Sequence, residues 1–182
     1  LVQVSDRTDH IAWGLAIARN IGADLNGDNV LDGDASCVPV VQTRIGFPMG
    51  PDTEIGFSGH YGFLKSTGAT EEEYNTWSVD FDFSVQVSSR IKLLGEGYAG
   101  ANTGAYFGAV LNGDCVTDLE SRGGWVNAQI EAADRVNLSI GYGIDDLANE
   151  RNTSVADRPD TRSRNQVMFG NGTYEVASGV KT

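Results

Sequence analysis

One acidic segment of the chain has the oxygen spacing of a calcium-binding loop. Two positions depart from the usual pattern, because Asn29 stands where glycine is usual and Ala35 where a bidentate glutamate is needed. The alternative interpretation is a solvated acidic turn rich in Asn-Gly and Asp-Gly. We therefore predict no cofactor, with calcium as the alternative. The metal ligands would be Asp24, Asn26, Asp28, Val30 and Asp32.

Residue types that support catalysis are scarce. His10 and His60 are the only histidines, and the sequence has no GxSxG elbow, HExxH motif or phosphate-binding glycine loop. A hydrolase needs a serine, a histidine and an orienting partner together, and only His60, near Ser58, could supply them. A polar residue in a strand is the simpler interpretation of His60. We predict that the chain is not an enzyme and has no catalytic residues.

Other polar residues recur at every second position of apolar segments. In the segment 77–87 all odd positions are apolar and all even positions are polar. A period of two is typical of a strand with one apolar and one wet face. The predicted lipid-facing residues are Trp77, Val79, Phe81, Phe83, Val85 and Val87. The predicted pore-lining residues are Arg44, Asp80, Asp82, Lys92, Glu96, Asn127, Gln129, Glu131 and Asn137.

Further segments repeat the alternation. It is clear in 11–18, 54–63 and 136–145, and weaker in 124–132. In 165–173 the sequence does not decide which face is apolar. Strands of about ten residues suit a tilted crossing of a bilayer.

The links between these strands alternate between short and long. Short links fall near 5–9, 48–53, 88–90, 133–135 and 177–179, and long links near 21–36, 66–75, 101–121 and 145–162. Outer-membrane barrels have short periplasmic turns and long extracellular loops. We therefore predict an all-β fold, an antiparallel up-and-down meander of about ten strands that is part of a transmembrane β-barrel. Residues 1–182 would form a single segment of that barrel. Both ends fall within strand patterns, so we expect an internal portion of a longer protein.

Charge is distributed unevenly along the chain. The 25 acids and 13 bases give a net charge of −12, which argues against nucleic acid as a partner. The four long links contain 15 of the acids and three of the bases, so they account for the entire net charge. An acidic mouth concentrates cations, which predicts a mild cation preference. No run reaches the roughly 18 apolar residues of a membrane helix, which excludes a helical membrane protein.

The two cysteines, Cys37 and Cys115, are predicted to lie at the same rim. An oxidising exterior could join them if the long links fold inward. Two intervening strands leave open whether their Cα atoms come within 7 Å.

A soluble or surface-exposed, calcium-stabilised β-domain is the alternative to a channel. An adhesin or a propeller-like binding module also has alternating strands, and a blade of about 40–45 residues would match the spacing of the short links. However, a blade holds four short strands, whereas each period here holds two long ones. The Gly-His…Trp-Asp signature of such blades is missing as well.

Four stretches of the chain resemble the Gram-negative outer-membrane porins, in particular the porin-like proteins of planctomycetes. They are IKLLGEGYAG at 91–100, SRGGW at 121–125, GYGIDD at 141–146 and RSRNQVMFGN at 162–171. The resemblance implies a water-filled barrel in the bacterial outer membrane that admits small hydrophilic solutes or ions. Its partners would be outer-membrane lipid and those solutes, and a homo-oligomer is compatible with it. The resemblance assigns no substrate-binding residue.

Overall fold

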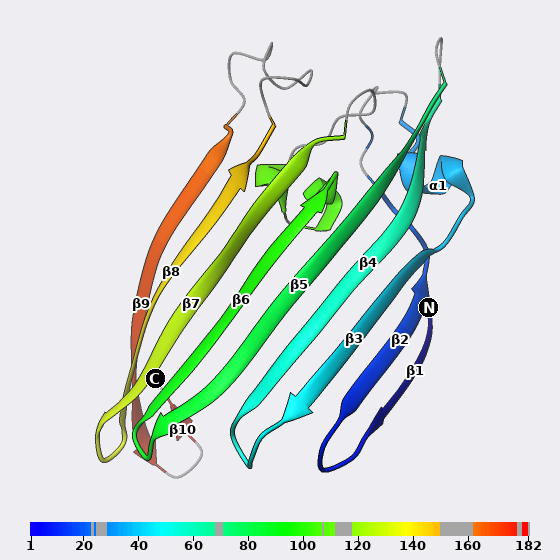
Figure 1. Ribbon diagram of the computed structural model, residues 1–182. Helices are drawn as coiled ribbons and strands as arrows, with labels where there is room; N and C mark the ends of the chain where they lie inside the picture. The colour runs from blue at the N-terminus through cyan, green and yellow to red at the C-terminus, as the bar shows by residue number, and fades with distance from the viewer. Residues whose placement is uncertain are drawn as a thin grey trace.

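The computed structural model describes residues 1–22, 24, 29–67, 71–106, 108–111, 118–149, 162–177 and 180–181. One antiparallel sheet contains all ten strands, and their order in the sheet follows the chain (Figure 1). The predicted all-β, up-and-down meander is confirmed. The strands are β1 (Val2–Arg7), β2 (Ala12–Ala18), β3 (Val40–Pro48), β4 (Glu54–Ser66), β5 (Glu72–Ser88), β6 (Ile91–Ala101), β7 (Glu120–Ala133), β8 (Val136–Leu147), β9 (Arg164–Ala177) and β10 (Val180–Lys181).

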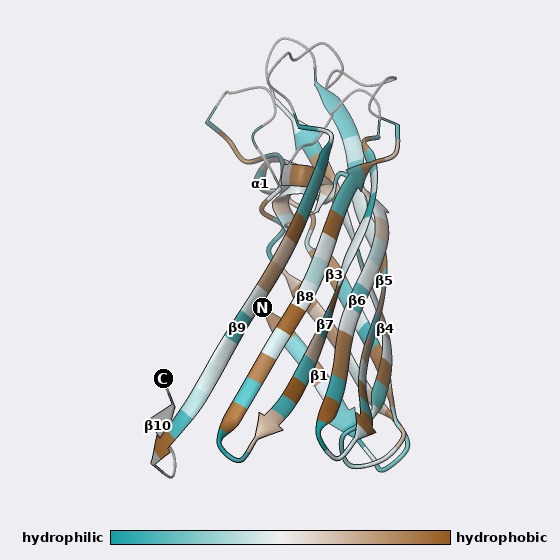
Figure 2. Ribbon diagram, turned by 90° about the vertical axis from the view of Figure 1, so that its left-hand side faces the viewer, coloured by the Kyte–Doolittle hydropathy of each residue, from teal (hydrophilic) through white to brown (hydrophobic). Residues whose placement is uncertain are grey.

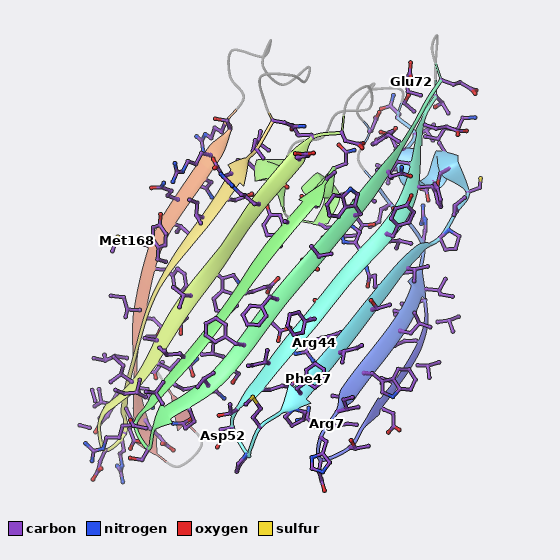
Figure 3. The ribbon with its side chains drawn as sticks, in the orientation of Figure 1. Arg7, Arg44, Phe47, Asp52, Glu72 and Met168 are labelled. Atoms are coloured by element: carbon purple, nitrogen blue, oxygen red, sulfur yellow. The ribbon has the colours of Figure 1, made fainter. Side chains whose placement is uncertain are left out.

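The sheet has one end with tight connections, here the turn rim, and one with longer connections, here the loop rim. At the turn rim the strands are joined through residues 8–11, 49–53, 89–90 and 134–135, and at the loop rim the strand ends are those joined through residues 19–39, 67–71, 102–119 and 148–163. Asp52 and Glu72 mark these opposite ends (Figure 3). The tight turns are possible because Arg135 and Gly50 adopt positive φ angles of 67° and 144°.

The predicted long link 66–75 is wrong in extent. Strands β4 and β5 continue into it, and Lys65 pairs with Glu73 and Ser66 with Glu72. The three consecutive glutamates 71–73 favour a loop in the sequence, but Lys65 offsets part of their charge. Its Nζ lies 2.8 Å from the Glu71 carboxylate. The connection therefore narrows to residues 67–71.

The sheet curves into an open trough, so it has a convex and a concave face (Figures 1 and 2). Cross-strand pairing assigns residues to these faces. On the convex face Ile45 pairs with Phe57, and Phe57 with Phe81. On the concave face Arg44 pairs with Ser58, and Ser58 with Asp80. Polar side chains therefore line the inside of the trough and apolar side chains cover its outside.

The convex face is apolar and exposed. Phe57 and Val79 are 53% and 60% exposed, and Phe81 is 39% exposed. Their aromatic neighbours pack within the face, with ring centroids of Phe57 and Phe81 5.4 Å apart. Such packing within one face leaves the outer surface of every ring uncovered. In the described part of the chain no second sheet covers this face, unlike in a β-sandwich.

No helix among the described residues is long and apolar enough to cross a membrane.

A small core lies on the concave face near the loop rim. Helix α1 (Asp32–Ser36) packs against β4, and the 3-10 turns η1 (Thr103–Tyr106) and η2 (Ala109–Leu111) lie against β5, β7 and β8. This approach requires glycine at position 33, where an added Cβ would lie 2.5 Å from the backbone oxygen of Asn20. The buried apolar residues among those described are Val40, Leu64, Tyr74, Ala101, Ala109, Leu119 and Leu147.

Candidate functional site: the concave wall

All nine residues predicted to line a pore lie on the concave face. Cross-strand pairs connect them, for example Lys92 with Gln129, Asp82 with Glu96 and Glu131 with Asn137. Arg44 contacts Asp82 directly. Asn127 instead exchanges hydrogen bonds of 2.7 and 3.0 Å with Ser139. The set therefore extends over one face of strands β3 to β8, with Leu94 and Trp125 among its polar members and one ion pair between them, Arg44 with Asp82.

Four charged side chains form an alternating chain near the turn rim. Nη2 of Arg7 lies 3.0 Å from Glu54, whose other carboxylate oxygen lies 2.9 Å from Nη2 of Arg44. Arg44 also donates through two nitrogens to both oxygens of Asp82, at 2.6 and 3.2 Å. Arg44 and Arg7 are both labelled in Figure 3. These ion pairs connect β1, β3, β4 and β5, and the contact between Arg7 and Glu54 spans β2 and β3, which lie between their strands.

A glycine makes room for this network. A Cβ at Gly56 would collide with both the Arg44 guanidinium and the Asp82 carboxylate. The side chain of Arg44 is 40% exposed, so the pair stays in contact with water. Its energy is therefore of the order of an exposed ion pair, about 0.2–1 kcal/mol, strengthened by bidentate geometry. The network fixes the positions of these four charges on the concave face.

His60 is hydrogen bonded on both ring nitrogens. Its Nε2 lies 2.9 Å from the Thr76 hydroxyl and its Nδ1 lies 2.9 Å from the Ser78 hydroxyl. Ser78 donates its proton to Asp80 at 2.8 Å, so Ser78 accepts from Nδ1–H of His60. The hydroxyl groups that hold His60 are thus those of Thr76 and Ser78, and not that of Ser58, the serine nearest to it in sequence. A hydrolase needs its carboxylate on the histidine, whereas here the carboxylate binds the serine.

The described part of the β6–β7 link, here the inner link (residues 102–106, 108–111 and 118–119), folds onto the concave face. The Tyr106 ring stacks on His60 with centroids 4.1 Å apart. The Tyr106 hydroxyl donates to the buried Asn20 amide oxygen at 3.0 Å, and the Asn20 amide donates to the Phe63 carbonyl at 2.6 Å. Burial raises the pKa of the Tyr106 hydroxyl. The link is thus tied to the wall through a side chain that crosses the trough.

Two further side chains of the concave face form hydrogen bonds with the backbone of the inner link. The Tyr98 hydroxyl accepts from the Ala109 N–H at 3.0 Å and donates to Asp145. The second Asp145 oxygen accepts from the Val110 N–H at 2.7 Å. Ala109 and Val110 have φ angles of 51° and 49°, a strained region for residues other than glycine. The hydrogen bonds offset that strain and fix the link in place.

Sequence reasoning did not find the residues that hold the inner link. Tyr106 lies in the long link predicted at 101–121, Tyr98 in the strand before that link, and Asp145 at the start of the long link predicted at 145–162. The signal that could have found the contact is the pair of consecutive aromatic residues at 106–107. Two consecutive aromatic side chains in a connection between strands indicate packing against another part of the protein.

The calcium prediction is neither supported nor tested by the described residues. Asn26 and Asp28 lie outside them. Asp24 accepts a hydrogen bond from the Asn29 N–H at 3.0 Å, as in an acidic turn, and Val30 is exposed. Asp32 is buried at the start of α1 and accepts from the Tyr74 hydroxyl. Among the described residues, no group of three or more His, Cys, Asp or Glu could hold a metal ion.

An ion pair lies beside the same segment. Nε of Arg19 donates to Asp34 at 2.6 Å, and this hydrogen bond holds the pKa of the Asp34 carboxyl below its usual range. Arg19 was not counted among the charges of the long links. Its position therefore reduces the negative charge that the loop rim was predicted to carry.

Cys37 is exposed at the end of α1, where its backbone adopts a left-handed conformation with φ of 54°. Cys115 lies outside the described residues. The bond between them stays a prediction.

Comparisons with known proteins identify a likeness of fold. No family model matches the chain. No curated protein matches it either. The crystal structure of the outer membrane channel DcaP of Acinetobacter baumannii matches with a TM-score of 0.75 and 11% sequence identity. The match covers 98% of this chain and 52% of DcaP, so the chain spans about half the length of that channel. The sheet is therefore similar in fold to about half of that channel.

Proposed function

We propose that this chain forms part of the wall of a bacterial outer-membrane channel for passive diffusion of small hydrophilic solutes. One observation carries the proposal: the apolar face of the sheet is convex and exposed, while the polar face is concave. A soluble protein would bury the apolar face. Figure 2 shows brown, apolar residues alternating with teal, polar ones along β7 and β8.

Physical chemistry connects this arrangement to a membrane. Bilayer hydrocarbon cannot satisfy backbone polar groups, so only closed hydrogen-bonded ladders and helices cross it. A ten-stranded meander satisfies its backbone between neighbouring strands and presents hydrocarbon outward. The fold likeness to an outer membrane channel supports the same conclusion. The pore lining would be the nine residues of the concave face, with mild cation preference arising from the acids of the loop rim.

The test is extraction and reconstitution of the full-length protein. We expect the protein to sediment with outer membranes, to need detergent for solubility, and to give stepwise ion conductance in planar bilayers. A matched control is the same protein denatured before addition to the bilayer, which should give no steps.

The competing function is a soluble or surface-exposed β-domain stabilised by calcium. It predicts a monomer that remains soluble without detergent and whose melting temperature rises with calcium. Either result, together with an absence of conductance, would overturn the channel proposal.

A further inference from the structure

A hollow of about 530 Å³ lies on the concave face beneath Tyr106. Its walls come from six neighbouring strands, β4 to β9, and its roof from the inner link. Three carboxylates line it, Asp80, Glu96 and Asp145, and none of the described lining residues is a lysine or an arginine. A solute inside this hollow therefore meets negative charge from the wall and no compensating base.

The three carboxylates are not equivalent. Asp145 uses both oxygens to hold Tyr98 and the Val110 N–H, and Asp80 accepts from Ser78. Glu96 is exposed, and among the described residues its side chain makes no hydrogen bond or ion pair. It also stands directly opposite Asp82 on the neighbouring strand. Arg44 neutralises Asp82, so Glu96 is the carboxylate left available for a ligand.

An aromatic surface adjoins this carboxylate. Trp125 is the cross-strand partner of Glu96 on β7 and is 41% exposed. On its other side Gly143 leaves a shallow floor, since a Cβ there would lie 3.5 Å from Cβ of Trp125 and 3.2 Å from Val167. An indole face next to a carboxylate attracts a cation in two ways, by charge and by the quadrupole of the ring. The floor between Trp125 and Val167 accepts hydrocarbon.

We propose that this hollow is a binding subsite for organic cations, meaning primary amines or guanidinium compounds that carry an apolar or aromatic group. The ammonium would lie between Glu96 and the Trp125 face, and the apolar group over Gly143 and Val167. The inference rests on the proposed channel function for its biological meaning. It extends that function by naming a class of solute that binds transiently to the concave face during passage.

The probes are phenylethylammonium, its neutral analogue phenylethanol and its anionic analogue phenylpropionate. Binding is measured by calorimetry on the detergent-solubilised full-length protein, and conductance block in planar bilayers on the same preparation. We expect the ammonium to bind more tightly than both analogues and to block the channel at matching concentrations. An exposed ion pair and a cation–π contact should each account for about a two- to fivefold difference in affinity between the ammonium and its analogues.

Two pairs of variants distinguish binding in the hollow from general effects of a substitution on the concave face. Each pair has one variant inside the hollow and one outside it. Glu96→Gln should weaken ammonium binding about threefold, whereas Glu131→Gln, on the same face but outside the hollow, should leave it unchanged. Trp125→Leu keeps an apolar contact and should weaken ammonium binding while sparing phenylethanol, whereas Phe169→Leu should change neither. Equal binding of all three probes, or equal effects of Glu96→Gln and Glu131→Gln, would overturn the proposal.

The two measurements keep this proposal distinct from the channel itself. Selective ammonium binding that Glu96→Gln weakens, without conductance, would support the subsite and contradict the channel. Conductance without selective binding would support the channel and contradict the subsite.

Discussion

The two faces of this sheet differ in what they contact within the molecule. Among the described residues the convex face packs against itself, with the ring of Phe81 beside those of Phe57 and Phe83, and Phe57 and Phe81 are exposed. The concave face receives α1 and the inner link, and its polar side chains bond to them. The face that folds against its own chain is thus the polar one. This reverses the arrangement of soluble sheets, and the proposed channel explains it, because the convex face of such a wall would meet lipid.

The largest difference between the two faces is expected when the same charge is placed on each of them. Val79→Arg on the convex face should destabilise the protein in lipid vesicles by about 2–4 kcal/mol, the cost of a cation in the bilayer midplane. Gln129→Arg on the concave face should change the free energy of unfolding by about 0.5 kcal/mol or less. Denaturant titration of both variants in vesicles measures this. Equal costs on the two faces would contradict the account.

The next effect concerns the docking of the inner link on the concave face. Tyr98→Phe removes the hydroxyl that accepts from the Ala109 N–H and donates to Asp145. We expect a loss of about 1–3 kcal/mol, because two polar groups lose their partner in a partly buried place. Hydrogen exchange should accelerate in the inner link and stay slow in β4 and β5. The matched control, Tyr142→Phe on the convex face, should leave exchange in the link unchanged.

A smaller effect is expected from the ion network near the turn rim. Arg44→Met leaves Asp82 unpaired beside Glu96 and should cost about 1 kcal/mol, since the pair is partly exposed to water. It should also raise cation preference, because the wall gains an uncompensated carboxylate. Asp82→Asn in the same background should restore both. Reversal potentials in a salt gradient and a double-mutant cycle test these expectations, and an unchanged reversal potential would argue against a charged lumen.

The smallest effect belongs to the loop rim. Joint neutralisation of Glu71, Glu72, Glu73 and Asp24 to their amides should lower cation preference in dilute salt. The difference should fade near physiological salt, where the Debye length is about 8 Å. Asp32 and Asp34 are left intact, because Tyr74 and Arg19 hold them and their loss would disturb packing. Reversal potentials at two salt concentrations decide this, and a preference for anions in dilute salt would refute it.

The strands were predictable from sequence where one face of the sheet imposes a strict alternation. The segment 77–87 shows this, because every odd residue meets the convex side and every even residue the concave side. In β9 the alternation fails, and the faces could not be assigned. Val167 and Phe169 lie on the concave face and Met168 projects from the convex one (Figure 3). Apolar residues are acceptable on both faces there, so periodicity carries no information.

The residues of the concave wall were found by the same alternation, but their contacts were not. Sequence spacing places Arg44 and Asp82 on one face, whereas their ion pair depends on the strand register and on the space above Gly56. The docking of Tyr106 on His60 is a contact between residues 46 positions apart, which no local pattern encodes. The extension of β5 to Glu72 was missed for a related reason, since pairing with β4 overrides the local preference of glutamates for loops.

The most direct test of the central claim follows accessibility along one strand. Spin labels are placed singly at positions 77 to 83 of β5 in the full-length protein, with the native cysteines replaced by serine, and the protein is reconstituted in vesicles. Collision with oxygen reports lipid, and collision with a water-soluble nickel chelate reports water. The account predicts two profiles of period two in opposite phase, with oxygen collisions highest at the odd positions. Nickel collisions highest at the odd positions, or the same accessibility at every position, would contradict it.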